Sequence, residues 1–175
     1  IATRDAGIAQ RVRQLRQHGV DIAAEDRRGA EVESYVEIGY NYRMTDVQAA
    51  VARVQLRKAD AIVAARRLRA LRYHEALAGV GIPPFGHAGH AFQRYLLRVR
   101  DPGTRERLVA ALAEAEIACR RGLQVVHRQP AWRHARPHLP VTEAIADTTV
   151  QLPLWAEMPE SDQARVIEVA RGALA

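Results

Sequence analysis

The amino-acid sequence predicts a chain of mixed class, α+β or α/β, with a mostly helical N-terminal part and an α+β C-terminal part. Three observations support this prediction. Apolar residues recur at helical spacing over most of the first 80 or so residues. Tyr95, Leu97 and Val99 then alternate with arginines, as in a strand, and strand-like and helical stretches follow one another to the end. With 175 residues, 48% of them hydrophobic, the chain is long enough to bury a core.

The first expected helix follows Asp5, whose side chain is suited to cap it. Ile8, Val12 and Leu15 lie on one face of this helix, and Gly19 supplies a stop after it. Residues 20–37 are polar and show no periodicity. We therefore expect a loop there, long enough to suggest a function.

The second expected helix begins at Thr45, which forms a capping box with Gln48. Its apolar pattern continues to Leu77, where glycines and prolines end it. One face carries valines: Val47, Val51 and Val54. Because more than thirty residues is long for one globular helix, we expect a break near Asp60, which would cap a further helix.

The rest of the chain is expected to alternate strands and helices. The expected elements are a strand from Tyr95 to Val99, a helix from Thr104, a strand over 117–125 interrupted at Gly122, a loop over 127–140, a short helix from Thr142, a strand from Thr149 to Leu152, and a last helix from about Glu160. This order indicates a small α+β domain.

Charge and composition exclude several classes of protein. The net charge is +6, yet the arginines are interleaved with acids and apolar residues, and aromatic residues make up only 5%. We therefore interpret basic stretches such as 66–72 as solvated helix faces and expect no nucleic-acid partner. The apolar runs are far shorter than the ~20 residues of a membrane span, so we expect a soluble protein. The single cysteine, Cys119, excludes an intrachain disulfide and favours a cytoplasmic setting.

Several catalytic motifs are missing from the sequence. It contains no phosphate-binding glycine motif and no nucleophile-elbow serine, which argues against nucleoside triphosphate chemistry and hydrolysis. Histidines occur in two close pairs, His87 with His90 and His134 with His138, but neither pair has the further ligands of a zinc site. We therefore predict no metal site.

Two stretches carry residue types suited to binding. Asn41 and Arg43 come directly before a capped helix start, where an amide, a guanidinium and backbone N–H groups can hold a phosphate or carboxylate. A structural role is also open, with Asn41 in a turn and Arg43 paired with a local acid. His127 follows a predicted strand and could contact a substrate or be an ordinary loop residue. Composition alone favours the structural role at both places.

Short motifs follow one another in a specific order along nearly the whole chain. They are Arg13-x-x-Arg16-x-His18-Gly19, Gly39-Tyr40-Asn41-Tyr42-Arg43-Met44-Thr45, His127-x-Gln129-Pro130-Ala131-Trp132 and Leu152-Pro153-Leu154. In this order they resemble the DegT/DnrJ/StrS family of nucleotide-sugar aminotransferases. Trp132 stands where tyrosine is common in the family, and Val125-Val126 replaces a usual tyrosine-proline pair.

The resemblance implies the fold and the reaction. It implies the C-terminal part of a fold-type-I transferase dependent on pyridoxal 5'-phosphate (PLP), in which a large domain holds the cofactor and a small domain closes over the substrate. It also implies a homodimer with shared active sites. The implied reaction moves an amino group from an amino acid, usually glutamate, to a keto sugar carried on a nucleotide.

The resemblance further implies that the catalytic lysine lies outside this chain. In the family, the lysine that forms a Schiff base with PLP lies shortly before the segment that begins here at Ile1. We therefore expect this chain to be part of a longer polypeptide and to be inactive alone. Lys58 is the single lysine, and it lies at a position that the family does not use for this purpose.

Three residues match binding positions of the family. Asn41 matches an asparagine that reaches across the dimer to the cofactor phosphate, and Arg43 matches a neighbouring arginine near that phosphate or near the carboxylate of the amino donor. His127 matches a small-domain histidine near the substrate entrance. Residues 20–36 resemble a loop that approaches the nucleotide sugar.

The resemblance also implies two domains: residues 1–59 as a remnant of the large PLP-binding domain, and residues 60–175 as the small domain. Because residues 1–59 would pack on a sheet that this chain lacks, we expect exposed apolar surface and aggregation. An alternative hypothesis is a noncatalytic paralogue that binds a sugar nucleotide or cofactor as a regulatory module. A basic nucleic-acid-binding module is a third hypothesis, and it predicts steep salt dependence of binding.

Overall fold

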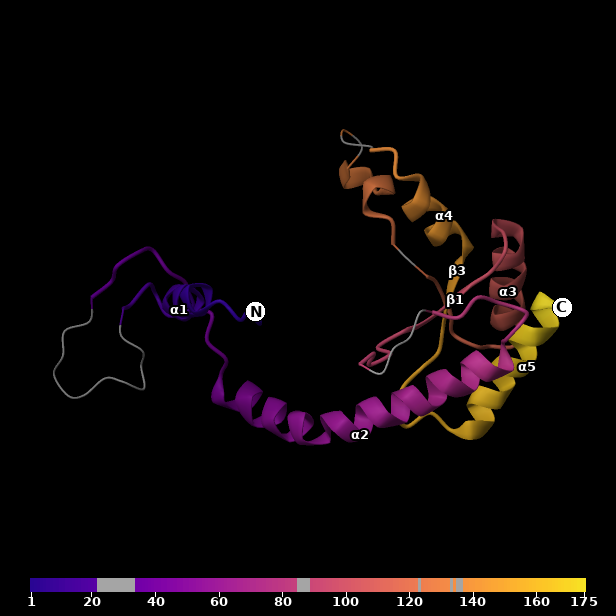
Figure 1. Cartoon of the computed structure of the whole chain (residues 1–175), viewed down its shortest axis with the longest axis horizontal. Helices are drawn as coiled ribbons and strands as arrows, with labels where there is room; N and C mark the ends of the chain where they lie inside the picture. The colour runs from indigo at the N-terminus through magenta and orange to yellow at the C-terminus, as the bar shows by residue number, and fades with distance from the viewer. Residues whose placement is uncertain (22–33, 85–88, 123, 133, 135–136) are drawn as a thin grey trace. The chain divides into compact units, whose positions relative to one another are not determined.

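The computed structural model describes residues 1–21, 34–84, 89–122, 124–132, 134 and 137–175, and the observations below concern these residues. They divide into two compact units, Ile1–Arg57 and Lys58–Ala175. The described residues form five α-helices, two 3₁₀ turns and three short strands. Figure 1 labels the helices and the two longer strands. This combination confirms the predicted mixed class, while the proposed domain limits, residues 1–59 and 60–175, stay a prediction.

The first unit contains α1, Ala6–Leu15. Asp5 caps this helix as predicted, since its Oδ1 accepts a hydrogen bond from the backbone N–H of Ile8 at 2.9 Å. The chain turns after α1 through Gly19, whose φ is +78°. A Cβ atom on Gly39 would clash with the backbone of Gly19, so the close approach of these two segments requires glycine. Most of the predicted loop over 20–37 lies outside the described residues.

α2 runs from Asp46 to Ala76 without interruption, so the expected break near Asp60 is wrong. Thr45 and Gln48 form the predicted capping box, in which each side chain accepts from the other's backbone N–H, at 3.3 and 3.0 Å. Alanine, lysine and arginine surround Asp60, and neither glycine nor proline occurs nearby. A single exposed aspartate costs too little in helix propensity to end such a stretch.

The second unit contains a three-stranded antiparallel sheet in the order β1–β3–β2. β1 (Tyr95–Arg98) and β3 (Thr149–Leu152) lie where the sequence predicted strands. β2 is only Arg120–Arg121, so the longer strand expected over 117–125 is wrong. Its pairing with β3 ends next to Gly122, where a Cβ atom would clash with the side chain of Thr149.

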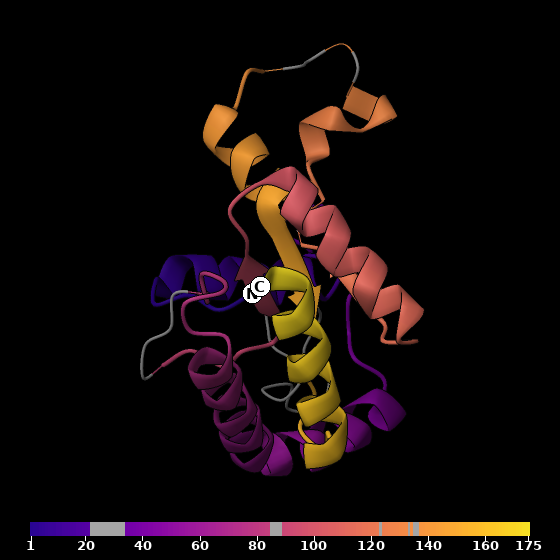
Figure 2. The ribbon, with the colours of Figure 1, turned by 90° about the vertical axis from the view of Figure 1, so that its right-hand side faces the viewer.

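Helices pack against this sheet around one core. α3 (Pro102–Glu114) and α5 (Glu160–Leu174) lie side by side in Figure 2, and the C-terminal half of α2 joins them. Asp101 caps α3, so this helix begins slightly before the expected Thr104. The Tyr73 hydroxyl donates to the carbonyl oxygen of Pro153 at 2.9 Å. The largest fully buried side chains are Tyr73, Tyr95, Leu77, Leu97, Leu108, Leu112, Leu152 and Met158.

Arginines on α2 bind carbonyl groups of later segments. Arg66 donates to the carbonyl oxygen of Gln93 at 2.9 Å, and Arg67 donates to that of His90 at 2.9 Å. Arg69 donates through two nitrogens to the carbonyl oxygen of Met158, at 2.9 and 2.6 Å. The interpretation of residues 66–72 as a solvated helix face is therefore wrong for these side chains, which hold α2 to the rest of the unit.

α4 (Pro140–Thr148) and the 3₁₀ turns η2 (Val126–Arg128) and η3 (Pro130–Trp132) complete the second unit. α4 begins before the expected Thr142, because proline suits the first position of a helix. α4 continues directly into β3. The Thr149 hydroxyl donates to the carbonyl oxygen of Ile145 at 2.6 Å, which fixes this junction.

Candidate functional site

Asn41 and Arg43 lie in the first unit, on the short segment that leads into α2. Backbone hydrogen bonds hold this segment against the end of α1: the N–H of Tyr42 donates to the carbonyl oxygen of Arg16 at 2.9 Å. The Tyr40 and Tyr42 rings stack with centroids 5.0 Å apart and planes 5° from parallel. The two candidate residues are therefore presented on an ordered segment at a helix start.

The side chains of Asn41 and Arg43 are exposed and bind each other. Arg43 Nε donates to Asn41 Oδ1 at 3.0 Å. Among the described residues, the terminal guanidinium nitrogens of Arg43 and the amide nitrogen of Asn41 have no hydrogen-bond partner. These donors can therefore bind an anion without breaking the contact between the two side chains.

The start of α2, together with Arg43, offers the hydrogen-bond donors and the positive charge that a phosphate group requires. In the first turn of α2 the N–H of Gln48 is capped by Thr45 Oγ1, while those of Asp46 and Val47 have no intrahelical acceptor, and the positive end of the helix dipole points there. A guanidinium adds paired donors and a full positive charge. The carboxylate of Asp46, the first residue of α2, opposes an anion at this end, and Arg43 offsets that charge.

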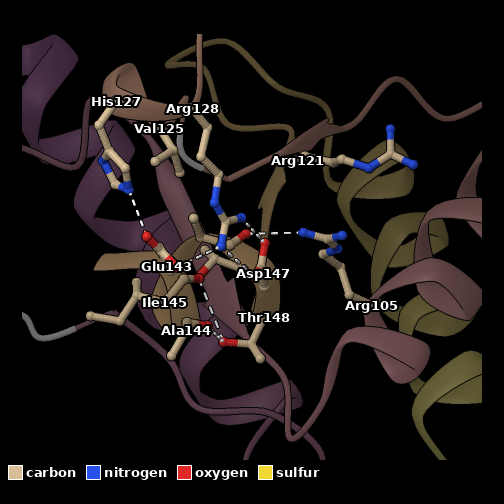
Figure 3. Close-up of polar contacts among 12 residues, drawn as sticks. Arg105, Arg121, Val125, His127, Arg128, Glu143, Ala144, Ile145, Asp147 and Thr148 are labelled. Atoms are coloured by element: carbon tan, nitrogen blue, oxygen red, sulfur yellow. Dashed lines mark hydrogen bonds and ion pairs between the residues drawn. The ribbon is translucent and has the colours of Figure 1, made fainter. Parts of the chain in front are cut away.

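His127 and Arg128 lie on η2 in the second unit, and both bind acidic residues of α4 (Figure 3). His127 Nε2 lies 2.8 Å from Glu143 Oε1. Arg128 donates to Glu143 Oε2 at 3.2 Å, and to the two oxygens of Asp147 at 2.7 and 3.1 Å. Glu143 and Asp147 are four residues apart, so both project from one face of α4 toward η2.

These contacts change the acid–base properties of the cluster. Hydrogen bonds from His127 and then from Arg128 hold the pKa of Glu143 below its usual value. The hydrogen bond from Arg128 also lowers the pKa of Asp147, and the two acidic partners raise the pKa of Arg128. Both carboxyl groups are therefore ionised at neutral pH, and their oxygens can only accept hydrogen bonds.

The second ring nitrogen of His127 remains available. The His127 side chain is only 11% exposed, and Glu143 is 27% exposed. Nδ1 has no hydrogen-bond partner among the described residues, yet it is not one of the buried unpaired polar atoms found there, so solvent reaches it. The ring is therefore held at one nitrogen and accessible at the other.

The structure brings Asn41 and Arg43 together in one unit and holds His127 in the other. Trp132, one of the residues that depart from the family pattern, lies half-exposed on η3. The sequence analysis missed Arg128, Glu143 and Asp147. Two acids four residues apart on an expected helix were the available signal, but nothing local indicated that they face η2.

No group of three or more His, Cys, Asp or Glu side chains within the described part of the chain could hold a metal ion. His87, one member of a predicted pair, lies outside the described residues. No helix in the described part is long and apolar enough to cross a membrane.

The sequence matches one protein family, and the fold matches known structures. Residues 1–171 match the sequence model of the DegT/DnrJ/EryC1/StrS aminotransferase family. A DegT DnrJ EryC1 StrS aminotransferase from Brucella abortus is similar in structure, with a TM-score of 0.80 and 31% identity; the match covers 99% of this chain and 45% of that one.

Two further structures give a similar result. DesV from S. venezuelae, solved in complex with a ketimine intermediate, has a TM-score of 0.82 and 26% identity, over 99% of this chain and 46% of that one. The PMP form of Spr1654, a sugar aminotransferase candidate from Streptococcus pneumoniae, has a TM-score of 0.82, covering 98% of this chain and 46% of that one; at 21% identity it supports the fold alone. The chain thus spans less than half the length of these structures.

Proposed function

We propose that this chain is a portion of a PLP-dependent sugar aminotransferase. It belongs to the DegT/DnrJ/EryC1/StrS aminotransferase family, because residues 1–171 match the sequence model of that family. The complete enzyme moves an amino group from an amino acid, glutamate, to a keto sugar linked to a nucleotide. It is a cytoplasmic homodimer with shared active sites. The observation that carries the proposal is the match over nearly the whole chain, together with the common fold.

Asn41 and Arg43 are proposed to hold the phosphate of PLP. Their unpaired donors and the N–H groups at the start of α2 support this role, because a phosphate oxygen accepts several hydrogen bonds at once. When bound, PLP supplies the carbonyl group and the electron sink on which an amino group is carried between two substrates. The protein's part here is to bind and orient that cofactor.

His127 is proposed to contact the nucleotide-sugar substrate. Its ring is held by Glu143 and keeps one nitrogen accessible, which is the arrangement expected of a side chain that orients a ligand. The lysine that carries out the chemistry is proposed to lie in the part of the enzyme outside this chain. Lys58 is an exposed residue of α2 and has no part in the proposal.

The upstream reading frame gives the first test. A frame that continues before the Ile1 codon and encodes a lysine shortly before it, with an acidic residue further upstream, supports an aminotransferase. A frame that continues without that lysine instead favours the noncatalytic paralogue.

Chemical labelling gives a second test, because Lys58 is the single lysine of the chain. We expect that borohydride reduction in the presence of stoichiometric PLP produces no saturable modification of Lys58 in this chain. In the complete enzyme, the same treatment should modify the upstream lysine. Asn41→Ala should then weaken PLP binding by about tenfold or more, as expected for the loss of a hydrogen bond to a charged group. Saturable modification of Lys58 would contradict the proposal.

A further inference from the structure

We propose that Glu143 is a positioning residue that fixes the His127 ring so that Nδ1 faces the substrate and binds one of its hydroxyl groups. The inference rests on the proposed function, in which His127 contacts a nucleotide sugar. It concerns Glu143, which touches neither substrate nor cofactor in this proposal, and it assigns a chemical class to the group that His127 recognises.

Glu143 determines which ring nitrogen of His127 carries the hydrogen. Nε2 lies 2.8 Å from a carboxylate oxygen of Glu143, which can only accept a hydrogen bond while it is ionised. Nε2 must therefore carry the hydrogen, whether the ring is neutral or protonated. The Glu143 carboxylate thus selects one tautomer of the neutral ring.

Hydrogen bonds also hold the Glu143 carboxylate itself in place. One Glu143 oxygen is bound by His127 and the other by Arg128, whose guanidinium is fixed in turn by both oxygens of Asp147 (Figure 3). The Thr148 hydroxyl donates to the carbonyl oxygen of Ala144 at 2.7 Å, which ties the end of α4 next to β3. The Glu143 carboxylate is therefore held from both of its oxygens, on a helix that continues directly into β3.

The tautomer of His127 determines what Nδ1 can bind. In the neutral ring this nitrogen has a lone pair and no hydrogen, so it accepts hydrogen bonds. A sugar hydroxyl donates a hydrogen bond and is complementary to it. An ionised phosphate only accepts, so it would oppose the lone pair. In the neutral ring, Nδ1 therefore pairs with a sugar hydroxyl and not with an ionised phosphate.

The ring signals of His127 in ¹⁵N-labelled protein test the positioning directly. We expect the neutral ring to carry its hydrogen on Nε2 and this hydrogen to exchange slowly with water. In Glu143→Gln the exchange should become at least tenfold faster, because the charged acceptor is lost. Glu168→Gln, which changes an exposed glutamate on α5, is the matched control and should leave the signal unchanged.

Two results would overturn the inference: a neutral ring protonated at Nδ1 in the unmodified protein, or unchanged exchange in a folded Glu143→Gln variant. The first needs no variant, so the test remains decisive if Glu143→Gln fails to fold. Neither measurement uses substrate, and both are therefore independent of the proposed function.

The substrate contact is tested in the complete enzyme. Glu143→Gln should raise KM for the nucleotide sugar about tenfold while kcat and the KM for glutamate change little, and Glu168→Gln should change neither. A purely structural role for Glu143 would lower activity toward both substrates together, and that result would overturn the inference. Unchanged KM in His127→Asn would instead contradict the proposed role of His127 and leave the ring measurement standing.

Discussion

The two units of the chain differ in how far their apolar side chains are buried. In the second unit, core side chains such as Leu97 and Leu112 are completely buried. In the first unit, the exposed fractions of Ile38, Val47 and Tyr42 are 91%, 75% and 72%. Helices nonetheless form in both, and each has an aspartate cap of the same kind, Asp5 before α1 and Asp101 before α3.

The difference separates local from tertiary stabilisation. Caps and turns decide where a helix begins and ends, but most of a helix's stability in a protein comes from burial of its apolar face. Only the second unit provides that burial within the described residues. Under the proposed function, the exposed apolar side chains of the first unit would be covered by the rest of the enzyme.

Separating the two units should give the largest effect. Residues 58–175 expressed alone should keep their helical circular dichroism and unfold in one cooperative transition, because their core is complete. Residues 1–57 alone should show no cooperative transition and should bind a hydrophobic dye. A cooperative melt of residues 1–57, or none for residues 58–175, would contradict the comparison.

Leucine truncations should give the next largest effect. Leu112 on α3 is completely buried, whereas Leu56 on α2 is 76% exposed. Leu112→Ala should lower the free energy of unfolding by about 2–5 kcal/mol, because it leaves a cavity in the core. Leu56→Ala should change it by less than ~0.5 kcal/mol, as for most exposed positions. Urea titrations of both variants measure the free energy of unfolding. Equal losses in the two variants would contradict the comparison between the two units.

Local signals in the sequence explain which parts of the fold were predictable. The Asp5 cap, the capping box of Thr45 and Gln48, and the strand from Thr149 to Leu152 are each encoded within a few residues, and all were confirmed. The expected break at Asp60 was wrong because a capping residue alone does not end a helix that its neighbours favour. The expected strand over 117–125 was wrong because strand length depends on the partner strand.

The candidate site shows the same limit. Asn41 and Arg43 were proposed as binding residues because the motif around them resembles the family's, and the helix start beside them is a local feature of the sequence. Glu143 was not, because its partner His127 lies 16 residues earlier and the chain between them forms no regular pattern in the sequence. The placement of such pairs depends on how α4 docks, which single-sequence patterns do not report.

Replacing one of the arginines that anchor α2 should give a smaller effect. Arg69→Lys should lower the free energy of unfolding by about 1–2 kcal/mol, because an ammonium group cannot reproduce the two-nitrogen contact with the carbonyl oxygen of Met158. Arg57→Lys, at an exposed position on the same helix, is the control and should have almost no effect. Equal stability of the two variants would show that the contact with Met158 contributes nothing.

The smallest expected effect is local and depends on pH. Because the pKa values of Glu143 and Asp147 are lowered by His127 and Arg128, the ionised carboxylates stabilise the folded arrangement. This stabilisation is complete above the ordinary carboxyl pKa of about 4 and is lost as the pH falls through the lower folded values. The amide chemical shifts of Arg128 and Gln129 should therefore change below about pH 4, while those of the buried strand β3 stay constant. Glu143→Gln combined with Asp147→Asn should abolish that change, because the carboxyl groups whose protonation weakens the contact between η2 and α4 are then absent. If the change persists in this variant, other groups cause it.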